Sequence, residues 1–303
     1  MSARVVLVLG GGGFLGGHVG AAFTAAGRTV RSAGRADATS ARLPGLLAAV
    51  RPDVVVNAAG SVWDRTEQQM REDNTRFPER LLSALTALRR PPRLVHLGSV
   101  HEYGPTPSGV VLTEDHPAAP VGPYGRTKLA GTRAVLGAFQ EGALDGVVLR
   151  VSNVFGPAAP AGSLVGSVAG RLREVRDAGS RGAPHALRLA PLVALRDFVD
   201  VRDVADAVLA AATASGCSGQ IVNIGAGRPV RVRELVLRMV EFSGLDVAVV
   251  EDRPADRSRG AVSWQQIDVS RAARTLGWRP RIGLDRSLTD TLAAALSRPA
   301  PHG

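Results

Sequence analysis

A short apolar run followed by four consecutive glycines constrains the fold of this chain more than any other feature. Val5–Leu9 predicts a buried β-strand, Gly10–Gly13 follow at once, and Gly16 opens an Ala-rich segment that predicts a helix over residues 16–26. Glycine has no Cβ, so the backbone can turn tightly and a ligand can approach it closely. The helix N-terminus then presents backbone N–H groups to an anion. The segment therefore predicts a strand–turn–helix unit that binds the pyrophosphate of a dinucleotide.

The run of glycines leaves two registers of the fingerprint open. One register is G-x-G-x-x-G and uses Gly11, Gly13 and Gly16, whereas the other is G-x-x-G-x-x-G and begins at Gly10. A glycine motif alone is weak evidence in a chain with 35 glycines, and a structural turn without a ligand is the alternative. The preceding strand and the following helix favour the cofactor site. In either register the expected cofactor contacts are Gly10, Gly11, Gly13, Phe14, Leu15 and Gly16.

The end of the second predicted strand, residues 29–32, distinguishes NAD from NADP. A carboxylate at this place binds the ribose 2′-hydroxyl, whereas an arginine can bind a 2′-phosphate. Here the strand is followed by Ala33-Gly34-Arg35, and the first carboxylate is that of Asp37. The sequence therefore favours NADP(H) with Arg35 at the phosphate. A contact of Asp37 with the ribose or adenine leaves NAD(H) open, and a solvated loop arginine is the alternative role for Arg35.

A Tyr-x-x-x-Lys pair predicts proton-transfer chemistry. Tyr124 and Lys128 lie four residues apart at the start of a predicted helix over residues 124–140, so their side chains share one face. An isolated phenol has a pKa of about 10, and a neighbouring ammonium group lowers it. Lys128 could also bind the cofactor ribose. Ser99 follows a predicted strand over residues 93–97, and its hydroxyl is expected to hold a substrate carbonyl or the Tyr124 phenol.

Short β-branched runs alternate with Ala- and Leu-rich segments along the chain, which is typical of an α/β fold. We expect a Rossmann-type doubly wound parallel sheet with a smaller C-terminal α/β substrate-binding lobe. The cofactor domain is predicted from residues 1–157 and 186–226. The lobe is predicted from residues 158–185 and 227–303, including the segment 268–276.

The composition restricts the classes of partner. The net charge is +10, which is compatible with nucleic-acid binding, but the arginines are scattered and aromatic residues make up only 4%. We expect no nucleic-acid partner, and a basic surface would instead attract an anionic small molecule such as a nucleotide sugar. The lone Cys217 suits a reducing cytoplasm, and no apolar run approaches the roughly 18 residues of a membrane span. The expectation is a cytoplasmic protein without membrane or metal partners.

Further short motifs follow in order along nearly the whole chain. They occupy residues 57–59, 74, 99–104, 150–157, 196–201, 223–225, 253–256 and 276–280. Together with the glycine turn and the Tyr-x-x-x-Lys pair, they resemble the extended short-chain dehydrogenase/reductase family of nucleotide-sugar epimerases, dehydratases and reductases. The resemblance implies a homodimer formed through the helices at residues 76–88 and 124–140.

The same resemblance implies roles for individual residues. Ala58, Ala59 and Asn74 would join Lys128 in binding the cofactor. Asn153 would bind the sugar diphosphate. The substrate would also contact His101, Arg196 and Arg253, with the two arginines neutralising its phosphates from the lobe. A surface charge is the alternative for Arg253. His101 could titrate near neutrality or could simply line the pocket.

One departure from the family pattern narrows the reaction. In the 4,6-dehydratases an Asp-Glu pair directly follows the catalytic hydroxyl residue, whereas Val100 and His101 follow Ser99 here. A dehydratase is therefore disfavoured, and Glu102, displaced by one residue, is not assigned that role. Gly98 stands where a serine is common, and no role is assigned to it.

The C-terminal third resembles the 4-keto-6-deoxyhexose reductases of the family, particularly over residues 189–201 and 277–280. The favoured function is therefore NADPH-dependent reduction of a dTDP- or GDP-linked 4-keto-6-deoxyhexose at C4 in deoxysugar biosynthesis. Two alternatives stay open. One is an NAD-dependent nucleotide-sugar epimerase, and the other is a regulatory protein that binds the cofactor without chemistry.

Overall fold

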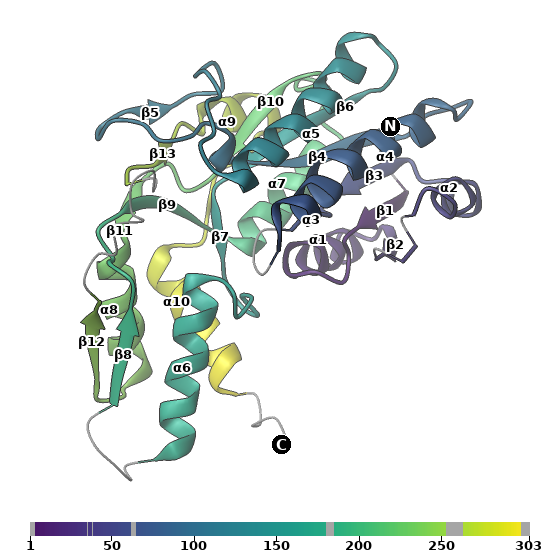
Figure 1. Cartoon of the computed structure of the whole chain (residues 1–303). Helices are drawn as coiled ribbons and strands as arrows, with labels where there is room; N and C mark the ends of the chain where they lie inside the picture. Colours follow the sequence, from purple (N-terminus) through teal and green to yellow (C-terminus); the bar gives the residue numbers. More distant parts are fainter. Residues whose placement is uncertain are drawn as a thin grey trace.

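The computed structural model describes residues 4–34, 36–37, 39–61, 65–179, 185–252 and 263–297. Within these ranges a parallel sheet of six strands forms the core of the larger domain, in the order β10-β6-β4-β3-β1-β2 (Figure 1). This arrangement confirms the predicted Rossmann-type α/β fold. The strands are β1 (Val5–Leu9), β2 (Thr29–Ala33), β3 (Val54–Asn57), β4 (Arg93–Ser99), β6 (Gly146–Val151) and β10 (Ile221–Ile224).

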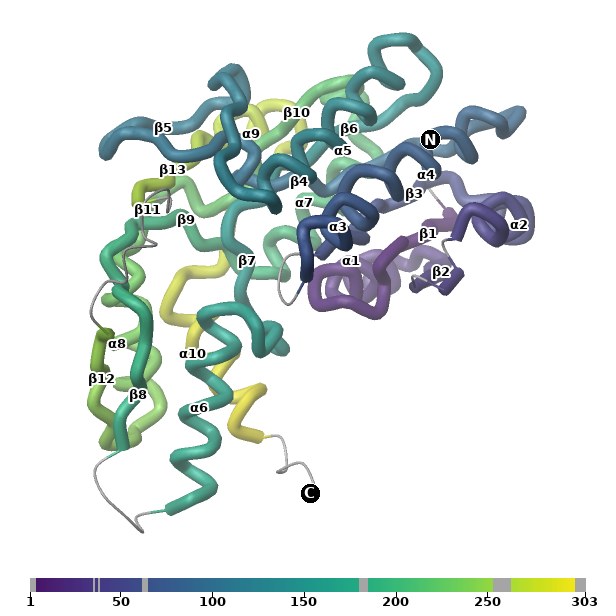
Figure 2. The backbone as a smooth tube through the Cα atoms, viewed as in Figure 1, coloured from purple at the N-terminus to yellow at the C-terminus, as the bar shows by residue number. Residues whose placement is uncertain are grey.

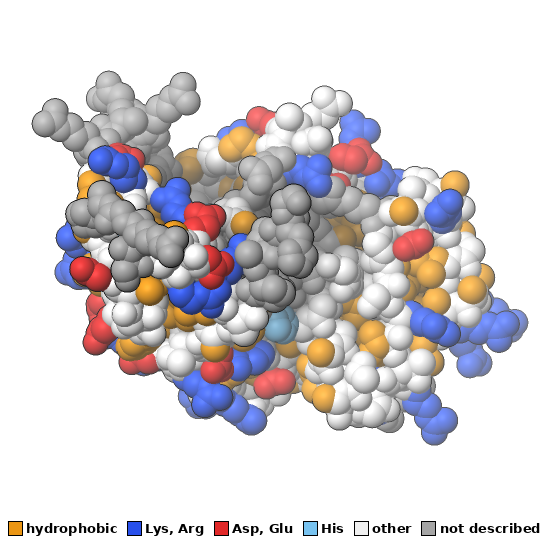
Figure 3. Space-filling view, turned by 90° about the horizontal axis from the view of Figure 1, so that it is seen from below, with side chains coloured by type: hydrophobic (Ala, Val, Ile, Leu, Met, Phe, Trp, Pro, Cys, Tyr) orange, Lys and Arg blue, Asp and Glu red, His pale blue; other side chains and the backbone are white. Residues whose placement is uncertain are grey.

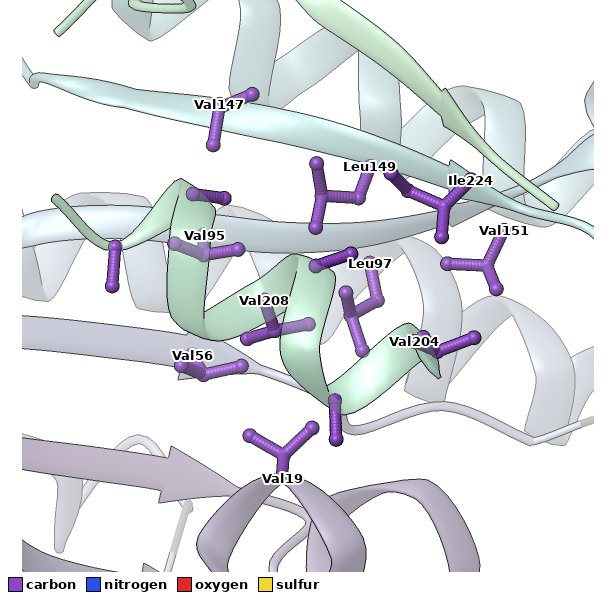
Figure 4. Close-up of a cluster of buried hydrophobic side chains, with 14 of the residues drawn as sticks. Val19, Val56, Val95, Leu97, Val147, Leu149, Val151, Val204, Val208 and Ile224 are labelled. Carbon is purple, nitrogen blue, oxygen red and sulfur yellow. The ribbon is translucent and has the colours of Figure 1, made fainter. Parts of the chain in front are cut away.

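Helices cover both faces of this sheet because alternate residues of each strand point to opposite sides. Helices α1 (Phe14–Ala25) and α7 (Val201–Ala211) pack against Val6 and Val8 of β1. Figure 4 shows the same cluster, with Val19 of α1 and Val208 of α7 directed towards the sheet. The other face is covered by α2 (Leu43–Val50), α4 (Phe77–Thr86) and α5 (Pro123–Gln140). The central strands β1, β3, β4 and β6 are therefore buried on both sides, as is usual in parallel sheets.

The strand order reverses at β1. The chain passes from β2 on one side of β1 to β3 on the other, and β1 pairs with β3 in parallel register from Val6–Val54 to Leu9–Asn57. Open α/β sheets bind ligands at such a switch point, beyond the carboxyl ends of the two strands. The glycine turn follows β1 and Ala58 follows β3, so the topology brings both predicted cofactor segments to this place.

A smaller lobe extends away from the sheet (Figures 1 and 2). Its apolar core includes the buried side chains of Leu172, Leu235 and Leu288, one from each of three helices. The elements of the lobe are α6 (Leu164–Ala178), α8 (Val232–Ser243), α10 (Leu284–Leu296), β8 (His185–Leu189) and β12 (Val247–Glu251). Where the lobe joins the sheet, a second small sheet is formed by β7 (Asn153–Phe155), β9 (Leu195–Asp200) and β11 (Pro229–Arg231).

Two segments pack differently from the sequence expectation. The helix α9 (Ser270–Leu276) was expected in the lobe, but its Ala272 is buried in the core of the sheet domain. Trp278, which follows α9, donates a hydrogen bond from Nε1 to the Asp203 carbonyl of α7 at 2.9 Å. Conversely, β8 was expected in the cofactor domain, yet it pairs with β12 in the lobe. In both cases long-range packing decides the placement, and the order of elements along the chain does not reveal it.

The remaining short elements lie near the carboxyl edge of the sheet or on its flank. They are α3 (Glu67–Arg71), the π-helical turn Glu72–Arg76, the 3₁₀ turn Val100–Glu102, β5 (Val111–Leu112) and β13 (Gln266–Ile267). Among the described residues, none of the helices combines the length and the hydropathy needed to cross a membrane. On the face seen in Figure 3, Lys and Arg side chains are interspersed with Asp and Glu.

Candidate active site

The glycine turn is built so tightly that side chains are excluded at two positions. Gly10 has a φ of +80°, and a Cβ on it would lie 2.9 Å from the Ala58 and Ala59 backbone. A Cβ on Gly16 would lie 2.1 Å from the Gly10 carbonyl oxygen. The same carbonyl accepts a hydrogen bond from the Gly13 N–H at 2.9 Å. The loops after β1 and β3 are therefore in direct backbone contact at the switch point.

A cavity of about 390 Å³ opens beside this turn. The N-cap of α1 is Gly13, which has no side chain, and the first turn contains no acidic residue. Backbone N–H groups at the positive end of the helix dipole can therefore bind a phosphate. The turn, the helix end and the cavity fit a dinucleotide. The cavity is lined by Gly10, Gly12, Gly13, Gly34, Thr39, Ala58, Ala59, Gly60, Asp73, Phe77 and Arg80.

The predicted cofactor residues occupy this region in different ways. Phe14 and Leu15 form the first turn of α1. The Asp37 carboxylate accepts a hydrogen bond from the Gly34 N–H at 3.1 Å and so closes its own loop. Arg35 lies outside the described residues.

Asn74 lies in the π-helical turn and acts through neighbouring protein groups. Its Oδ1 accepts from the Ser61 N–H at 3.1 Å, and its Nδ2 donates to the Ser61 carbonyl at 3.0 Å and to Thr127 Oγ1 at 3.2 Å. The predicted contact of Asn74 with the cofactor stays a prediction. In the structure its side chain ties the loop after β3 to α5, the helix that carries Tyr124 and Lys128. The irregular helical turn is consistent with a functional site.

Ser99, Tyr124 and Lys128 meet at the carboxyl end of β4. The Ser99 hydroxyl accepts a hydrogen bond from the His101 N–H at 3.3 Å and lies close enough to the Tyr124 phenol to lower its pKa. Lys128 is buried on the same face of α5 and donates from Nζ to the Leu97 carbonyl at 2.6 Å. Thus one hydroxyl, one phenol and one ammonium group are held together by the strand end and the helix start.

The charges around the phenol differ from the sequence expectation. Burial raises the pKa of Tyr124, the Ser99 hydrogen bond lowers it, the Glu102 carboxylate raises it, and the net direction is upward. Burial lowers the pKa of Lys128, with Glu102 opposing that shift. The expectation of a net lowered pKa for the Tyr124 phenol is therefore wrong for this structure. Burial of the phenol is the largest cause of the upward shift, and the ammonium group of Lys128 is bonded to a backbone carbonyl.

The predicted substrate residues gather beside Tyr124. The His101 ring lies edge-on to the Tyr124 ring, with centroids 5.6 Å apart, and it forms a hydrogen bond with Asn153. Burial, helped by the positive charge of Arg196, lowers the pKa of His101 to about 4. The expectation that His101 could titrate near neutrality is therefore wrong, because the imidazole stays neutral there.

The Asn153 side chain is also held by protein groups. Its Nδ2 donates to the Asp197 carbonyl at 2.7 Å and to Gln265 Oε1 at 2.5 Å. Arg196 lies on β9 beside Asp197, and burial lowers its pKa. His101 thus lies next to the phenol, and Asn153 and Arg196 act on His101. Arg253 lies outside the described residues.

Comparison with known proteins shows the family. Residues 6–225 match the NAD dependent epimerase/dehydratase family. The chain belongs to this family. The resemblance to extended short-chain dehydrogenases/reductases is thereby confirmed, and the cofactor class of this epimerase/dehydratase family member is NAD(P).

Individual relatives of this family member extend over almost its entire length. A dTDP-6-deoxy-L-talose 4-dehydrogenase (NAD(P)(+)) from Kitasatospora kifunensis is 41% identical over 97% of this chain and 96% of its own. A UDP-glucose 4-epimerase from Azospirillum brasilense is 31% identical over 91% of this chain and 87% of its own. The structure of RMD from Pseudomonas aeruginosa complexed with NADPH has a TM-score of 0.85, with 23% identity over 97% and 98% of the two chains. This last likeness shows the fold alone.

Several side chains of this family member's site were missed by the sequence reasoning. Thr39, Asp73, Phe77 and Arg80 line the cavity but belong to no motif that local spacing reveals. Asn74 was the nearby residue that the sequence analysis had assigned to the cofactor. Phe77 and Arg80 follow it three and six residues later, so its position could have indicated them. Glu102 was noticed in the sequence and set aside, yet it is completely buried behind Ser99.

Proposed function

We propose that this protein reduces the C4 carbonyl of a nucleotide-linked 4-keto-6-deoxyhexose with NADPH. The observation that carries the proposal is the meeting of Ser99, Tyr124 and Lys128 at the strand end beside the dinucleotide cavity. The 41% identical relative, named as a dTDP-6-deoxy-L-talose 4-dehydrogenase, supports oxidation–reduction at C4 and a dTDP-linked sugar.

The side chains of the site supply the proton of this reduction. Bound NADPH supplies a hydride to the C4 carbon, and the carbonyl oxygen then needs one proton to become a hydroxyl. Tyr124 donates that proton as the general acid, and Ser99 hydrogen-bonds the oxygen as negative charge develops on it. Lys128 stabilises the phenolate that remains until solvent returns the proton. The raised pKa of Tyr124 keeps the phenol protonated near neutral pH, as an acid in the reducing direction must be.

The preference for NADPH is a testable part of this proposal. Titration by calorimetry at fixed salt is expected to show NADPH binding at least about tenfold tighter than NADH, or about 1.4 kcal/mol. Arg35→Ala should remove this difference by weakening NADPH alone, because a guanidinium group recognises the 2′-phosphate. Tighter binding of NADH, or protein that purifies with NAD already bound, would favour the epimerase alternative. The 31% identical UDP-glucose 4-epimerase keeps that alternative open.

Arg196 provides a second test, on the substrate side. In this proposal its guanidinium group binds the diphosphate of the nucleotide sugar near His101. Arg196→Ala is expected to raise KM for the ketosugar about 10- to 100-fold with a smaller effect on kcat, because a phosphate contact far from C4 acts mainly on binding. Exposed Arg231 on β11 offers a matched control, Arg231→Ala, for the loss of one positive charge. Equal KM values in Arg196→Ala and the wild type would reject the proposed binding of the diphosphate by Arg196.

A further inference from the structure

Glu102 is a buried carboxylate in direct contact with the backbone of the site. It is 0% exposed and lies three residues after Ser99. Its Oε1 accepts hydrogen bonds from the Ser99 N–H at 2.8 Å and from Thr132 Oγ1 at 3.0 Å. Its Oε2 accepts from Arg150 Nε at 2.8 Å. Three separate elements, the end of β4, helix α5 and strand β6, are therefore joined at one side chain.

Gly98 provides the space that this carboxylate occupies. A Cβ at position 98 would lie 2.8 Å from Glu102 Oε1 and 3.3 Å from Thr132 Oγ1. Protein side chains do not approach so closely without displacing one another. Any side chain at position 98 would therefore displace the carboxylate of Glu102 from its observed position.

The partner of this carboxylate is itself fixed on both sides. Arg150 is 4% exposed, and its guanidinium carbon lies 4.5 Å from the centroid of the Tyr103 ring. The Tyr103 hydroxyl in turn donates to Asn223 Oδ1 on β10 at 2.8 Å. Removing one partner of a buried charge pair leaves the other charge unpaired and is strongly destabilising. The pair therefore holds the Glu102 carboxylate in place, with its Oε1 on the Ser99 N–H.

We propose that Glu102 is a positioning residue for proton transfer, because its buried carboxylate fixes the Ser99 backbone and thereby the hydroxyl that bonds the Tyr124 phenol. This assignment rests on the proposed function, since the acid that it concerns is Tyr124. It gives Glu102 a role other than the elimination chemistry of the dehydratases. The carboxylate lies behind Ser99, where it is bonded to Arg150 and Thr132.

The charge of Glu102 also acts on the phenol, against the effect of the Ser99 hydrogen bond. The groups that face the Tyr124 phenol are Ser99, Lys128, the neutral His101 ring and, behind them, Glu102. The negative charge raises the pKa of both Tyr124 and Lys128. Removing the negative charge of Glu102 should therefore let Tyr124 and Lys128 lose their protons at lower pH. The rate of ketone reduction should then begin to fall at a lower pH than in the wild type.

The test is the pH dependence of kcat in Glu102→Gln, compared with Thr132→Val. Glutamine keeps an acceptor for the Ser99 N–H but removes the charge. We expect kcat to fall about 10- to 100-fold and the alkaline limb of the kcat profile to move down by about one pH unit. Thr132→Val removes a hydrogen bond from the same carboxylate but keeps its charge, so its alkaline limb should stay at the wild-type pH. A wild-type kcat in Glu102→Gln would overturn the proposal.

A second measurement needs no substrate and separates this proposal from the proposed function. The chain has two tyrosines, Tyr103 and Tyr124, so the difference in ultraviolet phenolate absorbance between wild type and Tyr124→Phe isolates one phenol. After a rapid pH jump, this phenol should ionise at lower pH in Glu102→Gln. Such a shift in a protein that reduces no ketosugar would sustain the role of Glu102 and reject the ketoreductase. A phenol that ionises at the wild-type pH in both Glu102→Gln and Gly98→Ala would reject the role of Glu102.

Gly98→Ala tests the positioning directly if Glu102→Gln does not fold. The added methyl group pushes on Glu102 Oε1 while the charge remains. We expect a loss of kcat of about tenfold or more, with NADPH affinity unchanged and the alkaline limb near its wild-type pH. A wild-type kcat in Gly98→Ala would show that the position of this carboxylate is not important for the reaction.

Discussion

Tyr124→Phe is expected to lower kcat for ketone reduction by about 10²- to 10⁴-fold, which is the usual contribution of a positioned general acid. The phenol donates the proton to the developing alkoxide, and phenylalanine keeps the ring but has no proton to give. NADPH affinity should stay within about twofold, because the change removes a group that acts in the transition state. Single-turnover kinetics with NADPH and calorimetry of NADPH binding measure the two quantities separately.

Tyr103→Phe is the matched control for this experiment. Tyr103 is the other tyrosine, is completely buried, and donates its hydroxyl hydrogen to Asn223. The control should lose about 1 kcal/mol of stability with the hydrogen bond and keep most of its kcat. If Tyr124→Phe kept full activity, the catalytic role of Tyr124 would be rejected. If a cofactor-binding protein without chemistry were the correct description, wild type and both variants would be equally inactive.

Gly16→Ala is expected to disrupt the cofactor turn. The new Cβ would lie 2.1 Å from the Gly10 carbonyl oxygen, which is backbone and cannot rotate away. Overpacking strain of about 1–3 kcal/mol follows, and we expect NADPH binding to weaken about 10- to 100-fold in calorimetry. The melting temperature should fall as well, because the same backbone contact holds the loop after β1.

Gly17→Ala is the control, one residue further along α1. Its nearest atom to a new Cβ is the Gly11 carbonyl oxygen at 3.7 Å, which is an ordinary contact. Alanine should leave the NADPH affinity unchanged and stabilise the helix by about 0.5–1 kcal/mol. Equal NADPH affinities for Gly16→Ala and Gly17→Ala would contradict the account of the turn.

The sheet and the glycine turn could be predicted because their signals are local. Val5–Leu9 is a continuous apolar run, and the glycines follow it directly. The strand, the turn and the helix can therefore be predicted from one short stretch of sequence. The position of α9 could not be predicted in this way. Its amphipathic segment fits either the lobe or the sheet, and the contact of Trp278 with Asp203, 75 residues away, decides between them.

The residues proposed to act in catalysis could likewise be predicted only in part. The four-residue spacing of Tyr124 and Lys128 predicts their common face, but the direction of the Tyr124 pKa depends on burial, which the sequence does not specify. Glu102 is only one residue out of the dehydratase pattern. Its actual role requires Arg150, which is 48 residues away, and the space left by Gly98. A motif match compares residue types position by position along the sequence. The role of this carboxylate depends on residues that only the fold brings next to it.

The most direct test of the ketoreductase uses NADPH carrying deuterium as the transferable hydride, with a dTDP-4-keto-6-deoxyhexose as substrate. Products are analysed by mass spectrometry and NMR. We expect one NADPH to be consumed for each sugar converted and one deuterium at C4 of the product. Conversion of a nucleotide sugar without net consumption of cofactor, and without deuterium at C4, would contradict it.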